Sequence, residues 1–203
     1  MNSMIVPILL LLTYLVPSFL FDFMFEFWQG FVPYYFEFIF VAVVAFIYRK
    51  KLKFEIFSES KIGKSILIYT VAGFLTLVFA KIFSTELPFD LKNRGVLIFL
   101  LFLGPLLEEF IFRFSLWHLI KKITKCEKTA LYLTTCLFSL AHFKAVLIIK
   151  DPFLTFVVFQ SLYTMILGRQ LGERYLKRKS LTEVILLHSF YNAGFWIASM
   201  VFY

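Results

Sequence analysis

Charged residues are scarce in this chain of 203 residues, and cysteines are scarcer still. Asp, Glu, Lys and Arg together make up 17%, against roughly 25% in soluble domains. The only cysteines, Cys126 and Cys136, form no Cys-x-x-Cys pair, which argues against a zinc ribbon, a thioredoxin-like motif or a disulfide scaffold. We expect two unpaired thiols. No internal repeat or low-complexity linker divides the chain, so we expect a single domain over residues 1–203.

Apolar residues dominate the rest of the composition. They make up 61% of the chain, and Phe alone contributes 29 residues. A soluble monomer of this size would have to expose large apolar patches, which monomers avoid. The composition therefore excludes a disordered chain and a soluble nucleic-acid-binding protein. It predicts an integral membrane protein whose surface is solvated by lipid.

Seven apolar stretches approach or exceed the roughly 20 residues that a membrane-spanning helix needs. Charged or helix-breaking segments separate them. The sequence therefore predicts an all-α, polytopic transmembrane helix bundle of seven to eight spans, the eighth being short or re-entrant. The seven predicted spans are residues 4–25, 32–48, 62–84, 95–120, 128–149, 152–171 and 181–202.

The net charge of +8 is distributed unevenly over the loops. Most Lys and Arg residues lie in the loops 49–64, 121–128 and 169–179. With seven spans these three loops fall on one face of the membrane, which the positive-inside rule makes cytoplasmic. We therefore expect the cations to fix the topology rather than to bind nucleic acid, with the N-terminus inside and the C-terminus outside.

A few polar side chains interrupt the apolar segments. Ionisable groups at membrane depth cost about 2.5–3.5 kcal/mol each on insertion scales, which makes them candidates for function. They occur in three of the predicted spans: Glu108, Glu109 and Arg113 in 95–120, His142 in 128–149, and His188 with Asn192 in 181–202.

The first of these groups contains two adjacent glutamates. Glu109 and Arg113 are four residues apart, so they share a helix face and can form an ion pair. Glu108 is rotated by about 100° from Glu109 and lacks this partner. A free carboxylate in an apolar site suits general-base catalysis. A polar contact that holds helices together is an equally good interpretation of this group taken alone.

The other two groups also place side chains four residues apart. Phe138 can restrict the solvation and orientation of His142, although a buried core histidine is an alternative. His188 and Asn192 can bind an oxyanion with two donors from one helix, although an interhelical hydrogen-bonded pair is also possible. At about 1.5 Å per residue, all of these residues fall within a hydrocarbon core of about 30 Å and can meet in one cavity.

The three motifs are Glu-Glu-x-x-x-Arg at 108–113, Phe-x-x-x-His at 138–142 and His-x-x-x-Asn at 188–192. Because these motifs occur in this order on separate apolar segments, the chain resembles the CPBP family of CAAX proteases and bacteriocin-processing proteins. This family is also called Abi and includes the type II CAAX prenyl endopeptidases. The resemblance implies a glutamate-dependent intramembrane endopeptidase with an intramembrane cavity as its active site, and a motif-bearing core at about residues 95–202.

The resemblance also divides the motif residues into three pairs. One pair activates the attacking water, one forms the oxyanion hole, and one supports and orients the site. In that order the pairs are Glu108 with His142, His188 with Asn192, and Glu109 with Arg113.

The resemblance leaves the choice between a metal-free and a zinc-dependent peptidase open. Glu108, His142 and His188 can together hold Zn²⁺ with one open position. The His-Glu-x-x-His helix typical of zinc proteases is absent from the sequence, which favours a site without a cofactor.

Membrane lipid and a peptide or protein substrate are the partners that the resemblance implies. The substrate would be a prenylated CAAX protein or a bacteriocin-like peptide, with self-immunity as a related role. We expect a multi-pass protein of a bacterial cell membrane with cytoplasmic basic loops and no nucleic-acid partner. Two other functions stay open: a non-catalytic membrane immunity or partner protein, which would not need Glu108, and a proton-coupled transport protein.

Overall fold

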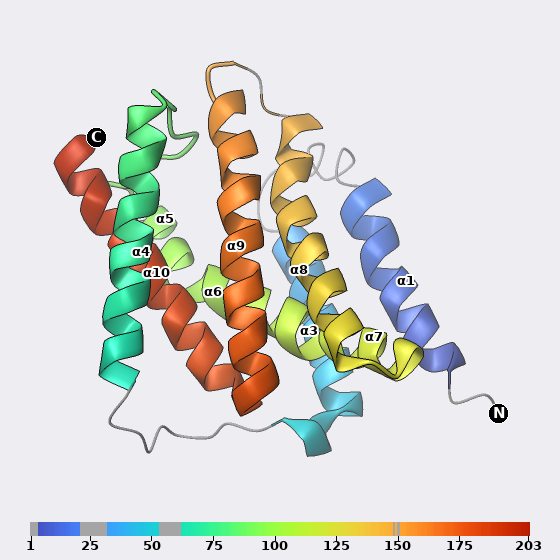
Figure 1. Ribbon diagram of the computed structural model, residues 1–203. Coiled ribbons are helices and arrows are strands. Elements are labelled where there is room, and N and C mark those ends of the chain that lie inside the picture. The colour runs from blue at the N-terminus through green and yellow to red at the C-terminus, as the bar shows by residue number, and fades with distance from the viewer. Residues whose placement is uncertain (1–3, 21–31, 53–61, 148, 150) are drawn as a thin grey trace.

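A computed structural model of the chain describes residues 4–20, 32–52, 62–147, 149 and 151–203. Residues 21–25 of the first predicted span and 53–61 of a predicted basic loop lie outside the described residues. All regular elements within the described ranges are helices, which confirms the all-α fold (Figure 1). The α-helices are α1 (Ile5–Leu20), α3 (Val32–Ile47), α4 (Ile62–Ile82), α5 (Arg94–Ile98), α6 (Gly104–Glu109), α7 (Trp117–Thr124), α8 (Glu127–Phe143), α9 (Leu154–Arg178) and α10 (Leu181–Phe202).

Four helical stretches in the described residues are long and apolar enough to cross a membrane. They correspond to predicted spans, and α1 and α3 add shorter apolar helices. The chain thus has the helices of an integral membrane protein. The four stretches are Ile62–Ile82, Arg94–Thr124, Glu127–Leu147 and Leu181–Phe202.

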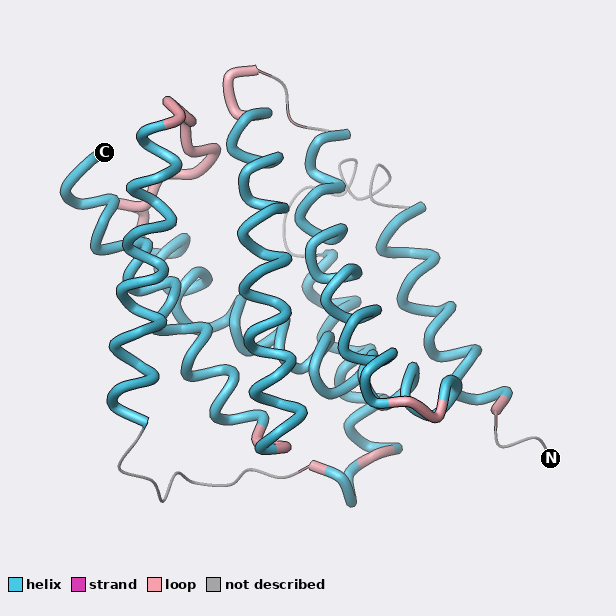
Figure 2. The backbone as a smooth tube through the Cα atoms, viewed as in Figure 1, coloured by secondary structure: helices cyan, strands magenta, loops and turns pink. Residues whose placement is uncertain are grey.

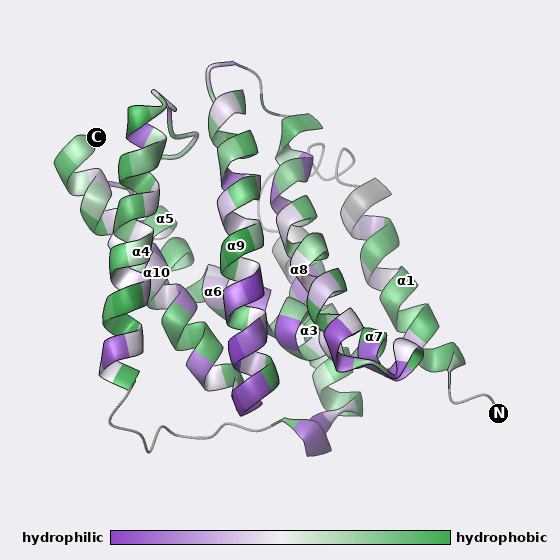
Figure 3. Ribbon diagram, viewed as in Figure 1, coloured by the Kyte–Doolittle hydropathy of each residue, from purple (hydrophilic) through white to green (hydrophobic). Residues whose placement is uncertain are grey.

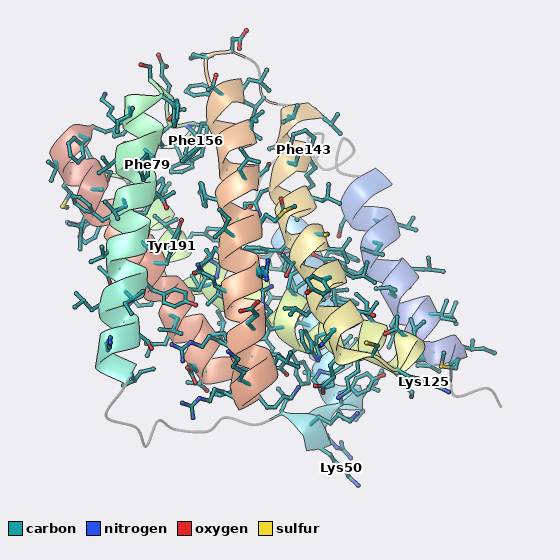
Figure 4. The ribbon with its side chains drawn as sticks, viewed as in Figure 1. Lys50, Phe79, Lys125, Phe143, Phe156 and Tyr191 are labelled. Carbon is teal, nitrogen blue, oxygen red and sulfur yellow. The ribbon has the colours of Figure 1, made fainter. Side chains whose placement is uncertain are left out.

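The basic segments lie together at one end of the bundle. This end holds the 3₁₀ turn Arg49–Lys51, the start of α8 and the end of α9, and Lys50 and Lys125 mark it in Figure 4. The hydropathy colouring places the most hydrophilic turns there (Figure 3). The connections from α4 to α5 and from α8 to α9 lie at the opposite end (Figure 2). We call these the basic end and the opposite end.

The stretch from Arg94 to Thr124 is one helix with two wider turns. In the π-helical segments Phe99–Leu103 and Phe110–Leu116, backbone hydrogen bonds join residues five apart instead of four apart. Gly104 and Pro105 begin the α-helical turns between them. Such π-helical turns are frequent at functional sites because they change the direction in which side chains point. Here they flank the two adjacent glutamates.

Helices α4 and α10 pack so closely that their backbones are in contact. A Cβ atom added to Gly73 would lie 1.8 Å from the carbonyl oxygen of Tyr191, and one added to Gly194 would lie 1.8 Å from that of Thr70. Small residues permit this approach, which is a common way of packing helices in lipid. The contact fixes the position of α10, the helix that carries His188 and Asn192.

Replacing Gly194 with alanine is expected to push α10 away from α4. Overpacking of this kind costs about 1–3 kcal/mol, so the thermal unfolding midpoint of the detergent-solubilised protein should fall. Gly63→Ala is the matched control, since nothing lies within 4 Å of its added Cβ. Equal midpoints for the two variants would show that the close approach does not stabilise the bundle.

Candidate active site

One cavity of about 630 Å³ brings the predicted catalytic residues together. It is formed by the stretch from α5 to α6 together with α8, α9 and α10. Residues more than 80 positions apart in the sequence thus line one space. Four of the lining residues are Glu108, His142, His188 and Asn192.

Glu108 lies between two imidazole rings. Its Oε1 atom is 4.0 Å from Nε2 of His142, and its Oε2 atom is 3.7 Å from Nε2 of His188. These distances are too long for direct hydrogen bonds, but a single water molecule can bridge them. The Glu108 side chain is 28% exposed, so it faces the cavity rather than the packed core.

His142 is oriented by its own helix. Its Nδ1 atom lies 2.9 Å from the carbonyl oxygen of Phe138, which can only accept a hydrogen bond. Nδ1 therefore carries a proton and donates it, and Nε2 is left facing Glu108. The Phe138 ring meets the imidazole edge to face, with centroids 4.9 Å apart, as the four-residue spacing predicted.

Behind the cavity lies a fully buried charged network. The expected ion pair is present, with 3.2 Å between Nε of Arg113 and Oε2 of Glu109, and both side chains are at most 1% exposed. The other oxygen of Glu109 accepts a hydrogen bond from Nδ1 of His188 at 2.9 Å. The second link was not predicted, because residues 79 positions apart are joined only by the packing of α10 on α6.

Phe138 lines the cavity and packs against Arg113 and His188 of this network. The Arg113 guanidinium lies 5.0 Å from the centre of its ring, and the His188 ring packs against it edge to face at 6.0 Å. Arg113 also donates a hydrogen bond through Nη2 to the carbonyl oxygen of Gly168 at 3.2 Å. A side chain at Gly168 would collide with Phe138, since an added Cβ would lie 2.8 Å from its ring.

Asn192 is held by the irregular backbone of the stretch from Arg94 to Thr124. The Gly104 N–H donates to the carbonyl oxygen of Phe99, five residues earlier. In this register the next bond would run from residue 105 to Leu100, but Pro105 has no N–H. Instead Nδ2 of Asn192 donates to the Leu100 carbonyl oxygen at 2.8 Å. One amide proton of Asn192 remains for other partners.

The sequence interpretation missed the wall that α9 contributes. Gln160, Tyr163 and Thr164 line the cavity. Their spacing of three and four residues places polar side chains on one face of the mostly apolar first half of α9. That pattern was available in the sequence, but it is common in helices of any function.

The described residues show no preassembled metal site. Within the part of the chain that the structure describes, no group of three or more His, Cys, Asp or Glu residues is arranged to hold a metal ion. Nδ1 of each imidazole has a partner and both Nε2 atoms face Glu108, an arrangement that a bridging water and a metal ion would share. The mechanism proposed below uses only the side chains of this protein.

Removing Arg113 is expected to leave the buried Glu109 carboxylate without its main counter-charge. Loss of one partner from a buried pair costs about 3–5 kcal/mol, so Arg113→Ala should lower the unfolding midpoint strongly. Arg169→Ala is the matched control, because Arg169 forms the same four-residue pair with Glu173 at the surface. An exposed pair contributes about 0–1 kcal/mol. Similar losses in both variants would contradict the role given to the network.

Comparison with known proteins identifies a family for this chain. The family described as type II CAAX prenyl endopeptidase Rce1-like matches residues 91–194, just over half the chain and all three motifs. No curated protein and no solved structure matches the chain in the corresponding comparisons. The chain therefore belongs to the Rce1-like family of type II CAAX prenyl endopeptidases.

Proposed function

We propose that this protein is an intramembrane endopeptidase of the glutamate type that needs no metal ion. The observation that carries the proposal is the position of the Glu108 carboxylate, 4.0 Å and 3.7 Å from two imidazole nitrogens in one cavity. Water bound in that gap would meet a carboxylate base beside the place where a peptide carbonyl can bind. Family membership supports hydrolysis of a peptide or protein substrate.

In the proposed reaction Glu108 and His142 hold the attacking water. The water donates one hydrogen bond to the carboxylate and the other to Nε2 of His142, whose lone pair is free because Nδ1 carries the proton. As the water oxygen attacks the peptide carbonyl carbon, its proton passes to Glu108. Glu108 then returns the proton to the departing amine nitrogen as the C–N bond breaks.

His188 and Asn192 stabilise the oxyanion in this mechanism. Because Nδ1 of His188 donates to Glu109, Nε2 can donate to an oxyanion only when the ring carries a second proton. An imidazolium at His188 together with Arg113 would balance the two carboxylates of Glu108 and Glu109. The free amide proton of Asn192 supplies the second donor.

The arrangement of the helices supports seven spans with the basic end in the cytoplasm. Cytoplasmic ends of membrane helices are rich in Lys and Arg, and the basic end of this bundle meets that rule. We place the protein in a bacterial cell membrane. Its substrate is a membrane-associated peptide, of which prenylated and bacteriocin-like peptides are the two classes that the family resemblance indicates.

Glu108→Gln and His142→Asn are each expected to abolish the hydrolysis of quenched fluorescent peptides by the purified protein in liposomes. Loss of general acid–base catalysis lowers the rate by about 10²–10⁴-fold. The test peptides carry either an S-farnesyl cysteine or no lipid, so the assay also compares substrate classes. Retained turnover in either variant would remove that residue from the mechanism.

Two control variants match these substitutions. Glu173→Gln removes a carboxylate whose side chain is 42% exposed. His118→Asn removes a histidine whose Nδ1 also bonds a carbonyl four residues earlier but which does not line the cavity. Both should keep normal turnover. A chelator should also leave turnover unchanged, and loss that zinc restores would overturn the metal-free mechanism.

Asn192→Ala is expected to lower kcat by about 10²–10³-fold while KM changes little, because an oxyanion donor acts mainly in the transition state. The variant also loses the bond to the Leu100 carbonyl, so its unfolding midpoint must be measured in parallel. A change in KM alone would contradict the oxyanion assignment.

A further inference from the structure

We infer that the cavity receives its substrate from the extracytoplasmic side of the membrane. The substrate class is then a peptide segment at the outer face, exported or anchored there by a lipid, rather than a prenylated C-terminus presented in the cytoplasm. This inference rests on the proposed peptidase function and adds the side from which the substrate comes.

The mouth of the cavity lies at the opposite end of the bundle. Among the residues that line the cavity, those that are exposed are Asn93 and Gly95, at the beginning of α5. Phe89 lines both this cavity and a second hollow of about 750 Å³ beside it. The second hollow is formed by residues 81–97 and the last turns of α10, which also lie at the opposite end (Figure 1). The two hollows are thus neighbours that share the Phe89 side chain, and the cavity that contains Glu108 is the one whose exposed lining lies at this end.

At the basic end, no described residue of the cavity lining is exposed. Between the cavity and the basic end, α9 and α10 bury Leu171, Val184 and Leu187 completely, at 0% exposure. Trp117 of α7 packs edge to face against Tyr175, with centroids 5.5 Å apart, and both are at most 4% exposed. The Glu109–Arg113 pair, at most 1% exposed, belongs to the same packed region. A cytoplasmic peptide would have to displace this core to reach Glu108.

The charges at the two ends assign the sides. The basic end combines Arg49–Lys51 with the lysines near the start of α8 and the end of α9. At the opposite end, Glu86 and Asp90 partly offset Lys81, Lys92 and Arg94. The positive-inside rule therefore puts the basic end in the cytoplasm and the mouth outside.

Cysteine labelling tests this assignment in the full-length protein in cell membranes. Single cysteines are placed at the mouth, Val96→Cys, and at an exposed site of the same end that does not line the cavity, Thr155→Cys, after Cys126 and Cys136 are replaced by serine. Native Cys126, which is exposed at the basic end, is kept in a third variant as the inside reference. The probe is a bulky, membrane-impermeant maleimide.

Val96→Cys and Thr155→Cys are expected to react in intact cells, and Cys126 only after permeabilisation. Labelled Val96→Cys should then lose most of its cleavage of an N-palmitoylated quenched peptide added outside, whereas labelled Thr155→Cys should keep it. Reaction of Val96→Cys only after permeabilisation, or labelling that leaves cleavage intact, would overturn the inference.

The same experiment distinguishes failure of the proposed peptidase function from failure of the inference about the side of entry. If wild type and Glu108→Gln cleave the peptide equally, the protein is not the peptidase, and the substrate assignment falls with it. The labelling pattern depends only on topology, so it still decides which side the mouth faces.

Discussion

The buried carboxylate of Glu109 is the point on which the site depends. In a bundle surrounded by lipid, an ionised group without partners is very costly, and Glu109 is completely buried. It uses one oxygen for Arg113 and the other for His188, and Arg113 continues to the Gly168 carbonyl. These contacts join α6, α9 and α10. The network therefore helps to set the distance between Glu108 and His188.

Irregular backbone in the stretch from Arg94 to Thr124 also positions a side chain of the site. Unpaired backbone groups are tolerated at membrane depth only where the protein or a cavity satisfies them. Pro105 frees the Leu100 carbonyl, and Asn192 satisfies it from α10. A helix break and a polar side chain, both unfavourable in lipid when alone, thus compensate each other. The same contact holds Asn192 at the wall of the cavity, with one amide proton to spare.

The two glutamates show how one helix can divide structural and chemical roles. Residues 108 and 109 are adjacent, so the turn between them sends their side chains in different directions. Glu109 points into the protein, where its charge is neutralised. Glu108 points into the cavity, where neither imidazole touches it directly. The proposed chemistry needs this difference, because a base that is already paired cannot take a proton from water.

The sequence by itself determined the helical membrane fold, the four-residue pairs and the family, because apolar length and helical spacing are local properties. It placed Glu109 beside Arg113 and Phe138 beside His142 without reference to other helices. Only the tertiary structure decided that His188 bonds Glu109 and that Asn192 bonds Leu100, because those partners come from different helices. The π-helical turns and the Gly73–Gly194 approach fix how α10 meets the other helices. No local pattern specifies that geometry, and so none could assign the mouth of the cavity to one end.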